Sequence, residues 1–360
     1  MSNAANPIDQ SRRKGRGANS NDPGRFDIAR EPFHDGWDME EELPPLRTQV
    51  SEEQPKTIIA RNSSPDIPFD RSINMYRGCE HGCIYCYARP SHAYLGLSPG
   101  LDFETRLIAK PTAPALLVEE LRKRRYKVQP LAIGTNTDAY QPIERDRRLM
   151  RQVLEVLRDF RHPVTITTKG SLIERDLDIL APMAADGLVQ VGIGVTSLDR
   201  DLARRMEPRV PSPERRLAVI KRLSEAGVPV RVMVSPIVPG LTDHEIEAIL
   251  QAGQAAGARA ASYITLRLPL EVSPLFRDWL AEHYPLRASR VMGQIRDMQG
   301  GQDYDPAWGK RMQGQGVFAT MIRRRFELAC ARLGLARELP ALRSDLFRVP
   351  PRAGDQLSLF

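Results

Sequence analysis

Three of the chain's four cysteines lie within eight positions, as Cys79, Cys83 and Cys86 in the stretch Y-R-G-C-E-H-G-C-I-Y-C-Y-A. Thiols this close in sequence can share a metal ion or a cluster. A structural zinc needs a fourth ligand, which His81 or His92 could supply. An iron–sulfur cubane held by three thiolates instead leaves one iron open to a substrate or cofactor. The spacing alone leaves both chemistries open.

The two glycines of this stretch, Gly78 and Gly82, allow tight turns in which backbone N–H groups approach the sulfur atoms. A disulfide scaffold is disfavoured, because such scaffolds pair their cysteines and are typical of short secreted chains.

The composition of the whole chain indicates a globular protein of the reducing cytoplasm. The N-terminal stretch has no apolar core of a signal peptide, and no apolar run is long enough to span a bilayer. The formal net charge of +7 favours a polyanionic partner such as nucleic acid. Basic runs at 122–127 and 323–325 are equally consistent with solvated helix faces.

Short apolar strands alternate with helical patterns from residue 70 onward, which is typical of parallel β/α units. We expect strands at 72–76, 130–135, 164–169, 188–196, 228–236 and 261–269, and helices at 114–125, 145–160, 176–187, 212–227 and 243–257. Around this core, 63–275, we expect a flexible or wrapping arm at 1–62, a helical extension at 276–345, and a flexible tail at 346–360.

Polar or glycine-rich segments follow the predicted strands. The cysteines follow the first, and G-T-N-T-D, T-K-G-S, G-V-T-S-L-D and S-P-I-V-P-G-L-T-D follow or end the second to fifth. Because the carboxyl ends of parallel strands meet at one edge, the sequence predicts one site at that edge.

The C-x3-C-x2-C spacing, with aromatic Tyr85 just before the third cysteine, resembles the radical S-adenosylmethionine (SAM) superfamily. The resemblance covers roughly 70–275 and implies an α/β fold, a partial (β/α)6 TIM-type barrel. It also implies a [4Fe-4S] cluster on Cys79, Cys83 and Cys86, and SAM chelated at the open iron. An electron from a donor such as flavodoxin or ferredoxin would cleave SAM to a 5′-deoxyadenosyl radical, which abstracts a substrate hydrogen.

The resemblance also assigns candidate SAM contacts around the rim. Tyr85 and the turn 238–243 would lie near the adenine, G-T-N-T-D near the methionine amine, Lys169 near the carboxylate, and the segment after the fourth strand near the ribose. Each assignment competes with ordinary packing, turn or helix-cap roles. The candidate cofactor-binding residues are Tyr85, Thr135, Asn136, Asp138, Thr168, Lys169, Ser197, Val238 and Gly240.

Within the superfamily, the pattern G-C-x3-C-x-Y-C-Y resembles the spore photoproduct lyase group, and Tyr87 belongs to that pattern. The lyase carries a hydrogen-returning cysteine in its second-strand motif, where this chain has Thr135. Cys330, the remaining thiol, is expected to be a small buried residue of a helix at 319–334. Tyr87 or Tyr140 are candidates to relay hydrogen instead. The cysteine count also leaves no ligands for a second cluster.

The two last segments suggest macromolecular partners. A glycine- and arginine-rich segment at 285–317 offers Tyr304 or Trp308 for stacking on a nucleotide, or a lid with buried aromatics. The final five residues resemble the peptide with which bacterial repair proteins bind the DNA sliding clamp. The clamp-binding candidates are Gln356, Leu357, Leu359 and Phe360.

These patterns favour a radical SAM enzyme acting on nucleic acid, in DNA repair or base modification. Two alternatives stay open: a radical modifier of a protein or small molecule, and a non-catalytic metal-binding adaptor.

Overall fold

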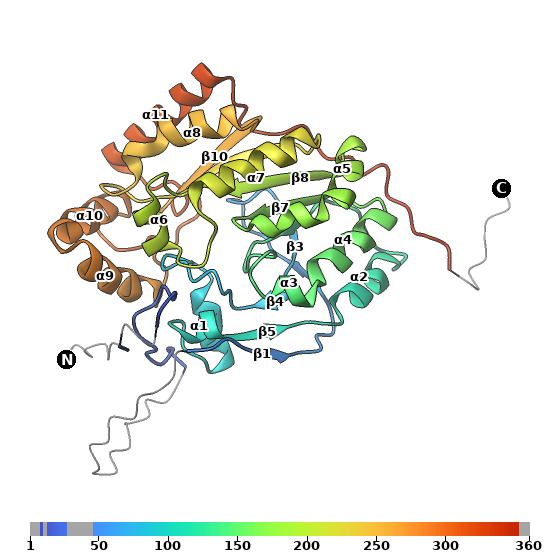
Figure 1. The fold of residues 1–360 in the computed structure, drawn as a ribbon, viewed down its shortest axis with the longest axis horizontal. Helices are drawn as coiled ribbons and strands as arrows, with labels where there is room; N and C mark the ends of the chain where they lie inside the picture. The colour runs from blue at the N-terminus through green and yellow to red at the C-terminus, as the bar shows by residue number, and fades with distance from the viewer. Residues whose placement is uncertain (1–7, 10–12, 27–45, 353–360) are drawn as a thin grey trace, which may run out of the picture.

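The computed structural model describes residues 8–9, 13–26 and 46–352 (Figure 1). Its main sheet has seven strands in the order β10-β9-β8-β7-β6-β3-β2, with parallel pairing from β3 to β10 and an antiparallel edge strand β2. The strands are β2 Ile59–Arg61, β3 Arg71–Ile73, β6 Leu131–Ile133, β7 Val164–Thr168, β8 Val189–Gly194, β9 Val230–Ile237 and β10 Ala260–Thr265. Spatial order follows chain order and the sheet stays open, which confirms the predicted α/β partial barrel.

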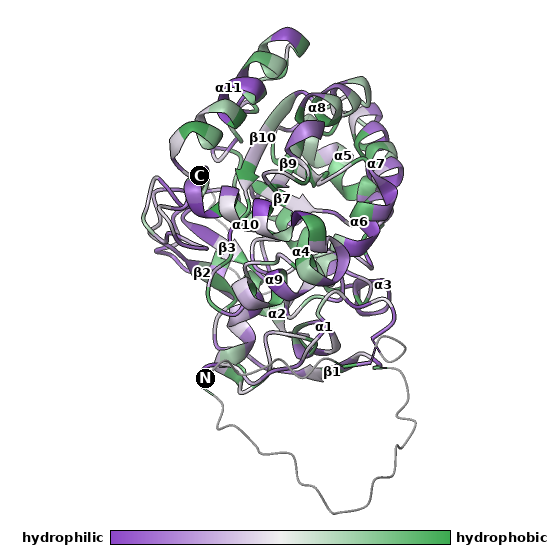
Figure 2. Cartoon of the chain, turned by 90° about the vertical axis from the view of Figure 1, so that its left-hand side faces the viewer, coloured by the Kyte–Doolittle hydropathy of each residue, from purple (hydrophilic) through white to green (hydrophobic). Residues whose placement is uncertain are grey.

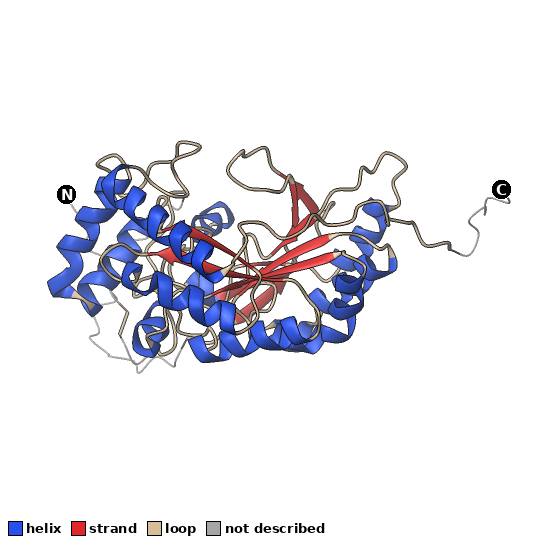
Figure 3. Cartoon of the chain, turned by 90° about the horizontal axis from the view of Figure 1, so that it is seen from above, coloured by secondary structure: helices blue, strands red, loops and turns tan. Residues whose placement is uncertain are grey.

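Five helices correspond to those predicted between the strands, and they lie along one side of the sheet while long loops lie on the other (Figure 3). They are α2 Ala113–Leu121, α4 Leu149–Asp159, α5 Leu177–Ala185, α7 Pro213–Glu225 and α8 Ile246–Ala255. Ser212 caps α7 by accepting a hydrogen bond from Arg215 N at 3.3 Å, the role in which serine is favoured at a helix start. The outer edge of α7 is hydrophilic (Figure 2).

The first predicted strand differs from the observed one. β3 ends at Ile73, and Tyr76–Arg77 forms β4, which belongs to a second sheet of order β1-β5-β4. β1 is Gln49–Glu52 and β5 is Arg106–Ala109. The cysteine loop therefore follows β4 and not the barrel strand directly. The strands of this second sheet are short and pair with segments that are distant in the chain. Local periodicity in the sequence therefore did not predict them.

Further helices complete the fold. α1 Asp102–Thr105 and the 3₁₀ helix η1 Arg89–Leu95 follow the cysteines, and α3 Glu144–Arg147 and α6 Arg200–Met206 lie within the barrel connections. The C-terminal part forms α9 Val272–His283, α10 Pro285–Met298 and α11 Gly316–Leu333. Cys330 on α11 is buried with the main hydrophobic core, as predicted.

The predicted domain boundaries stay predictions. The described residues of the N-terminal arm pack on the body, and α11 shares the core of the barrel. The clamp-like peptide 356–360 lies outside the described residues. Within the described part of the chain, no helix is long and apolar enough to cross a membrane.

Candidate active site

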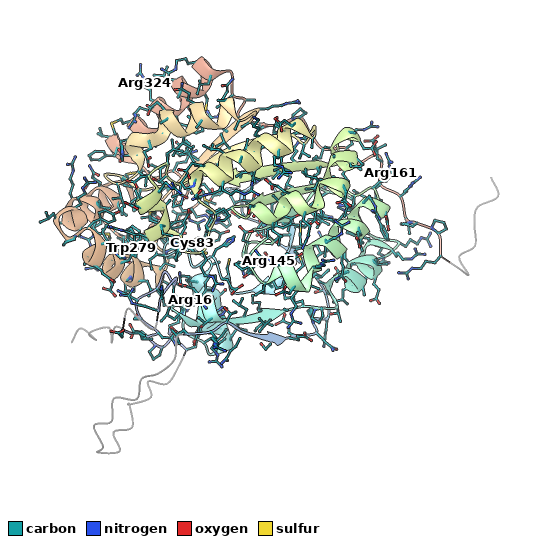
Figure 4. All side chains as sticks on the ribbon, in the orientation of Figure 1. Arg16, Cys83, Arg145, Arg161, Trp279 and Arg324 are labelled. Atoms are coloured by element: carbon teal, nitrogen blue, oxygen red, sulfur yellow. The ribbon has the colours of Figure 1, made fainter. Side chains whose placement is uncertain are left out.

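The cysteine loop presents three free thiols near the middle of the molecule, where Figure 4 labels Cys83. Cys79 and Cys83 are buried and Cys86 is half-buried. Burial, followed by Asp138 and the two other thiols, raises the pKa of Cys79, and burial raises the pKa of Cys83 to about 12. The thiolate form therefore needs nearby positive charge, which a bound metal supplies when it deprotonates a coordinating thiol.

A buried ion pair supports the loop from below. Arg89 and Glu104 are both fully buried, and Arg89 Nη2 lies 2.6 Å from Glu104 Oε1. Arg89 also donates to the carbonyl oxygens of Gly82 and Cys83, at 3.3 and 3.0 Å, and to those of residues 99 and 100. One guanidinium thus fixes the backbone between two of the three cysteines.

The N-terminal segment packs against the same loop. Gly17 N and Ala18 N each donate to Glu104 at 2.9 Å, and Arg16 Nη1 donates to the Glu104 carbonyl at 2.9 Å. A Cβ added at Gly17 would lie 1.8 Å from Gly82 O, so only glycine permits this approach. Sequence reasoning assigned no role to these residues, because their partner lies almost ninety positions away.

Asp138 connects the cysteine loop to two neighbouring strand ends. Its carboxylate accepts hydrogen bonds from Thr168 Oγ1 at 2.6 Å and Lys169 N at 2.8 Å, and it lies 3.3 Å from His81 Nδ1. Although burial opposes ionisation, His81 and these hydrogen bonds hold the pKa of Asp138 well below its usual range. Asp138 and Thr168 are therefore engaged with protein partners and brace the rim.

Lys169 places a cation beside the thiols. Burial alone would lower the pKa of Lys169, but Cys83, Glu207 and Asp138 together raise it. Its Nζ lies 5.8 Å from the ring centroid of Tyr85. The Tyr85 hydroxyl donates to Glu207, which pairs with Arg216 at 2.7 Å. The structure thus brings Lys169 and Tyr85 together, and their assignment to the carboxylate and the adenine of SAM stays a prediction.

Tyr87 and Tyr140 occupy different surroundings. The Tyr87 hydroxyl donates to Thr135 O, and its half-exposed ring lies 5.0 Å from the Arg267 guanidinium. Tyr140 is buried, and this burial raises the pKa of its hydroxyl. Asp176 and Glu144 raise that pKa further and Arg175 lowers it, and these three charges lie around the outer helices. The structure thus brings Tyr87, but not the Tyr140 hydroxyl, to the rim beside Cys86.

The remaining candidates lie at the same edge with backbone or capping partners. Asn136 N donates to Asn74 Oδ1 at 3.1 Å. Ser197 Oγ donates to Glu245 at 2.6 Å. In the turn 238–243, Val238 N donates to Thr242 Oγ1 at 2.9 Å and Gly240 N donates to Asp243 at 2.7 Å. Asp199, in the same segment as Ser197, caps α6.

The residues fit a cluster better than a single zinc ion. His81 Nδ1 pairs with Asp138, whereas His92 places Nε2 3.0 Å from the Arg106 carbonyl and keeps a buried Nδ1 without a hydrogen-bond partner. Among the described residues, no three His, Cys, Asp or Glu side chains are arranged to hold one ion. A cubane instead distributes its thiolates over separate irons, which suits three thiols on a loop that spans eight residues.

An open parallel sheet with three thiols at its edge is typical of one class of protein, and comparison with known families identifies that class. The model of the radical SAM superfamily matches residues 73–252, half of the chain. The chain belongs to the radical SAM superfamily.

Particular relatives refine this placement. An uncharacterized protein of Mycobacterium tuberculosis is 38% identical over 226 residues, which are 62% of this chain and 66% of that protein. One of Methanocaldococcus jannaschii is 30% identical over 213 residues, 59% of this chain and 76% of that protein. The chain thus spans slightly less than two thirds of the mycobacterial relative.

Among solved structures, spore photoproduct lyase complexed with dinucleoside spore photoproduct matches with a TM-score of 0.58 and 16% identity. The match covers 80% of this chain and 81% of the lyase chain. At this identity the likeness shows a shared fold.

Proposed function

We propose that this protein is a radical SAM enzyme that acts on nucleic acid, with Cys79, Cys83 and Cys86 as the ligands of a [4Fe-4S] cluster. The observation that carries the proposal is the set of three free thiols at the carboxyl edge of the parallel sheet, with the Lys169 cation beside them. When bound, the cluster supplies the electron that cleaves SAM reductively to a carbon radical.

The chain's own residues position and enclose this chemistry. Arg89 and Glu104 fix the loop backbone, and Asp138 holds the ends of β6 and β7 against it through Thr168 and Lys169 N. The half-buried Lys169 ammonium would attract the carboxylate of SAM, because Cys83, Glu207 and Asp138 outweigh burial and raise its pKa. Tyr87 follows Cys86 directly and its ring is half-exposed beside Arg267, so we expect it to meet the substrate.

A nucleic-acid substrate is supported by three independent features. The net charge is +7. The lyase with the same fold was solved with a dinucleoside bound. Aromatic side chains and an arginine line the rim next to the cysteine loop. A repair reaction of the lyase type would need another hydrogen donor, since Thr135 stands where the lyase has a cysteine; Tyr87 is our candidate.

Anaerobic turnover tests the proposal. The chain, reconstituted with iron and sulfide and reduced with dithionite, should cleave SAM, and deuterium from a labelled DNA or RNA substrate should appear in 5′-deoxyadenosine. Cys79→Ala, Cys83→Ala and Cys86→Ala should each lose the cluster. Stoichiometric zinc with no SAM cleavage would favour the adaptor. Cleavage without transfer from either nucleic acid would favour a protein or small-molecule substrate.

A further inference from the structure

Arg267 lies just beyond the carboxyl end of β10 and faces the rim between two tyrosines. Its guanidinium is 5.0 Å from the ring centroid of Tyr87 and 5.7 Å from that of Tyr304, and Nη2 donates to Tyr304 Oη at 3.2 Å. Two aromatic faces therefore fix the plane of the guanidinium, as cation–π packing does for arginine.

This cation has no counterion within the described residues. Asp66 is an acidic residue close enough to sense the charge of Arg267, but its carboxylate is taken by Gly309 N at 2.7 Å and Arg311 Nε at 2.5 Å. Arg267 Nε is buried and has no hydrogen-bond partner, and Nη1 has only the weakly accepting Met312 sulfur at 3.5 Å. Arg89 and Arg216, by contrast, are each paired with a buried carboxylate, Glu104 and Glu207 respectively.

The loop that carries Tyr304 is hydrogen-bonded to the last residue of β10, two positions before Arg267. Thr265 N and Thr265 Oγ1 donate to the Met312 carbonyl at 2.9 and 3.1 Å. The arrangement is therefore a built feature of the rim. An oriented guanidinium with unused N–H donors, held beside aromatic faces, is the arrangement that binds a phosphate whose base can stack nearby.

We propose that Arg267 binds a backbone phosphate of a single-stranded or flipped-out substrate nucleotide, with Tyr304 orienting the guanidinium. The inference rests on the proposed nucleic-acid function and adds to it the residue that holds the strand. The location of Tyr87 directly after Cys86 places this phosphate site next to the thiols. The substrate nucleotide is thereby positioned at the cysteine loop.

The test measures fluorescence anisotropy of a labelled twelve-nucleotide single-stranded DNA with the full-length reconstituted protein over a range of salt concentrations. Arg267→Ala should weaken binding about tenfold or more and reduce the slope of log K against log salt by about 0.7, the value for one phosphate on a single strand. Arg267→Lys should keep the slope but lose affinity, because it retains the charge without the fork. The control is Arg324→Ala on α11, an exposed arginine far from Cys83 in Figure 4, which should change neither.

The outcomes separate the two proposals. If the wild-type protein binds the oligonucleotide and Arg267→Ala leaves affinity and slope unchanged while its melting temperature is intact, the phosphate assignment is wrong and the proposed function stands. If the wild-type protein cleaves SAM but binds no oligonucleotide, the nucleic-acid function fails as well. Arg267-dependent binding of a poly-glutamate peptide in that case would assign the site to a carboxylate-bearing protein. Should Arg267→Ala fail to fold, the loss of affinity at constant slope in Arg267→Lys carries the decision.

Discussion

The base of the cysteine loop, formed by Arg89 and Glu104, and the rim of the site, at Arg267, differ in whether an arginine has a carboxylate partner. At the base, Arg89 and Glu104 are fully buried and satisfy each other, and the carboxylate also binds two N–H groups of the N-terminal segment. At the rim, Arg267 has aromatic neighbours and no carboxylate partner among the described residues. An arginine that is paired with a carboxylate, such as Arg89, holds the backbone in place. An arginine without such a partner, such as Arg267, is available to bind a ligand.

This difference separates the residues that stabilise the cysteine loop from the residues that we expect to bind the substrate. Substitutions at the base should act on stability and cluster retention, and substitutions at the rim should act on binding with little effect on stability. Variants of the base should therefore lower the free energy of unfolding more than variants of the rim do.

Glu104→Gln should have the largest effect. It keeps the shape of the side chain but leaves the Arg89 charge without its partner in a fully buried position, which costs about 3–5 kcal/mol. Urea unfolding should show that loss, and iron content after reconstitution and desalting should fall. The control is Glu282→Gln, whose 2.7 Å pair with Arg13 is partly exposed and should contribute less than about 1 kcal/mol. Equal effects of the two variants would contradict the special role of the base.

Lowering the pH should destabilise the protein through a group outside the base of the cysteine loop. His162 is buried between Tyr126 and Pro163, and burial lowers its pKa to about 4 from 6.5. Between pH 6.5 and pH 4, His162 therefore binds a proton in the unfolded chain but not in the folded chain. The free energy of unfolding should be highest above pH 6.5 and should fall by about 3 kcal/mol as the pH drops to 4.

His162→Gln should remove that part of the pH dependence in urea unfolding measured from pH 7 to pH 4. An unchanged slope in the variant would mean that another group, such as one in the base, controls acid sensitivity.

Gly17→Ala should produce an intermediate effect. The new Cβ would lie 1.8 Å from Gly82 O, so the N-terminal segment must shift, at a cost of about 1–3 kcal/mol that is typical of overpacking. Limited proteolysis should then cut within 13–26 faster than in the wild type. The matched control is Gly293→Ala in α10, where an added Cβ meets nothing within 4 Å and should be neutral or slightly stabilising. Unchanged proteolysis of Gly17→Ala would show that this segment does not depend on the close contact.

The sequence predicted the barrel because its signals are local. Alternating strands such as β7 and β9, and the Ser212 cap of α7, depend on neighbours within a few residues. The C-x3-C-x2-C spacing is local as well. The second sheet and the Gly17–Glu104 contact join segments that are distant in the chain, and their short polar stretches carry no periodicity. The unpaired state of Arg267 could not be predicted either, because it depends on which carboxylates fold near it.

Trp308→Ala should have the smallest effect on stability and the clearest effect on binding. The side chain is 62% exposed on the loop that also carries Tyr304, so its removal should change the free energy of unfolding by less than about 0.5 kcal/mol. If it stacks on a base next to the phosphate at Arg267, the same change should weaken single-stranded oligonucleotide binding by about 1–3 kcal/mol. Because stacking neutralises no phosphate, the salt slope should remain that of the wild type, unlike the slope in Arg267→Ala. A loss of stability without a loss of affinity would instead make Trp308 a packing residue of the loop and remove it from the substrate-binding rim.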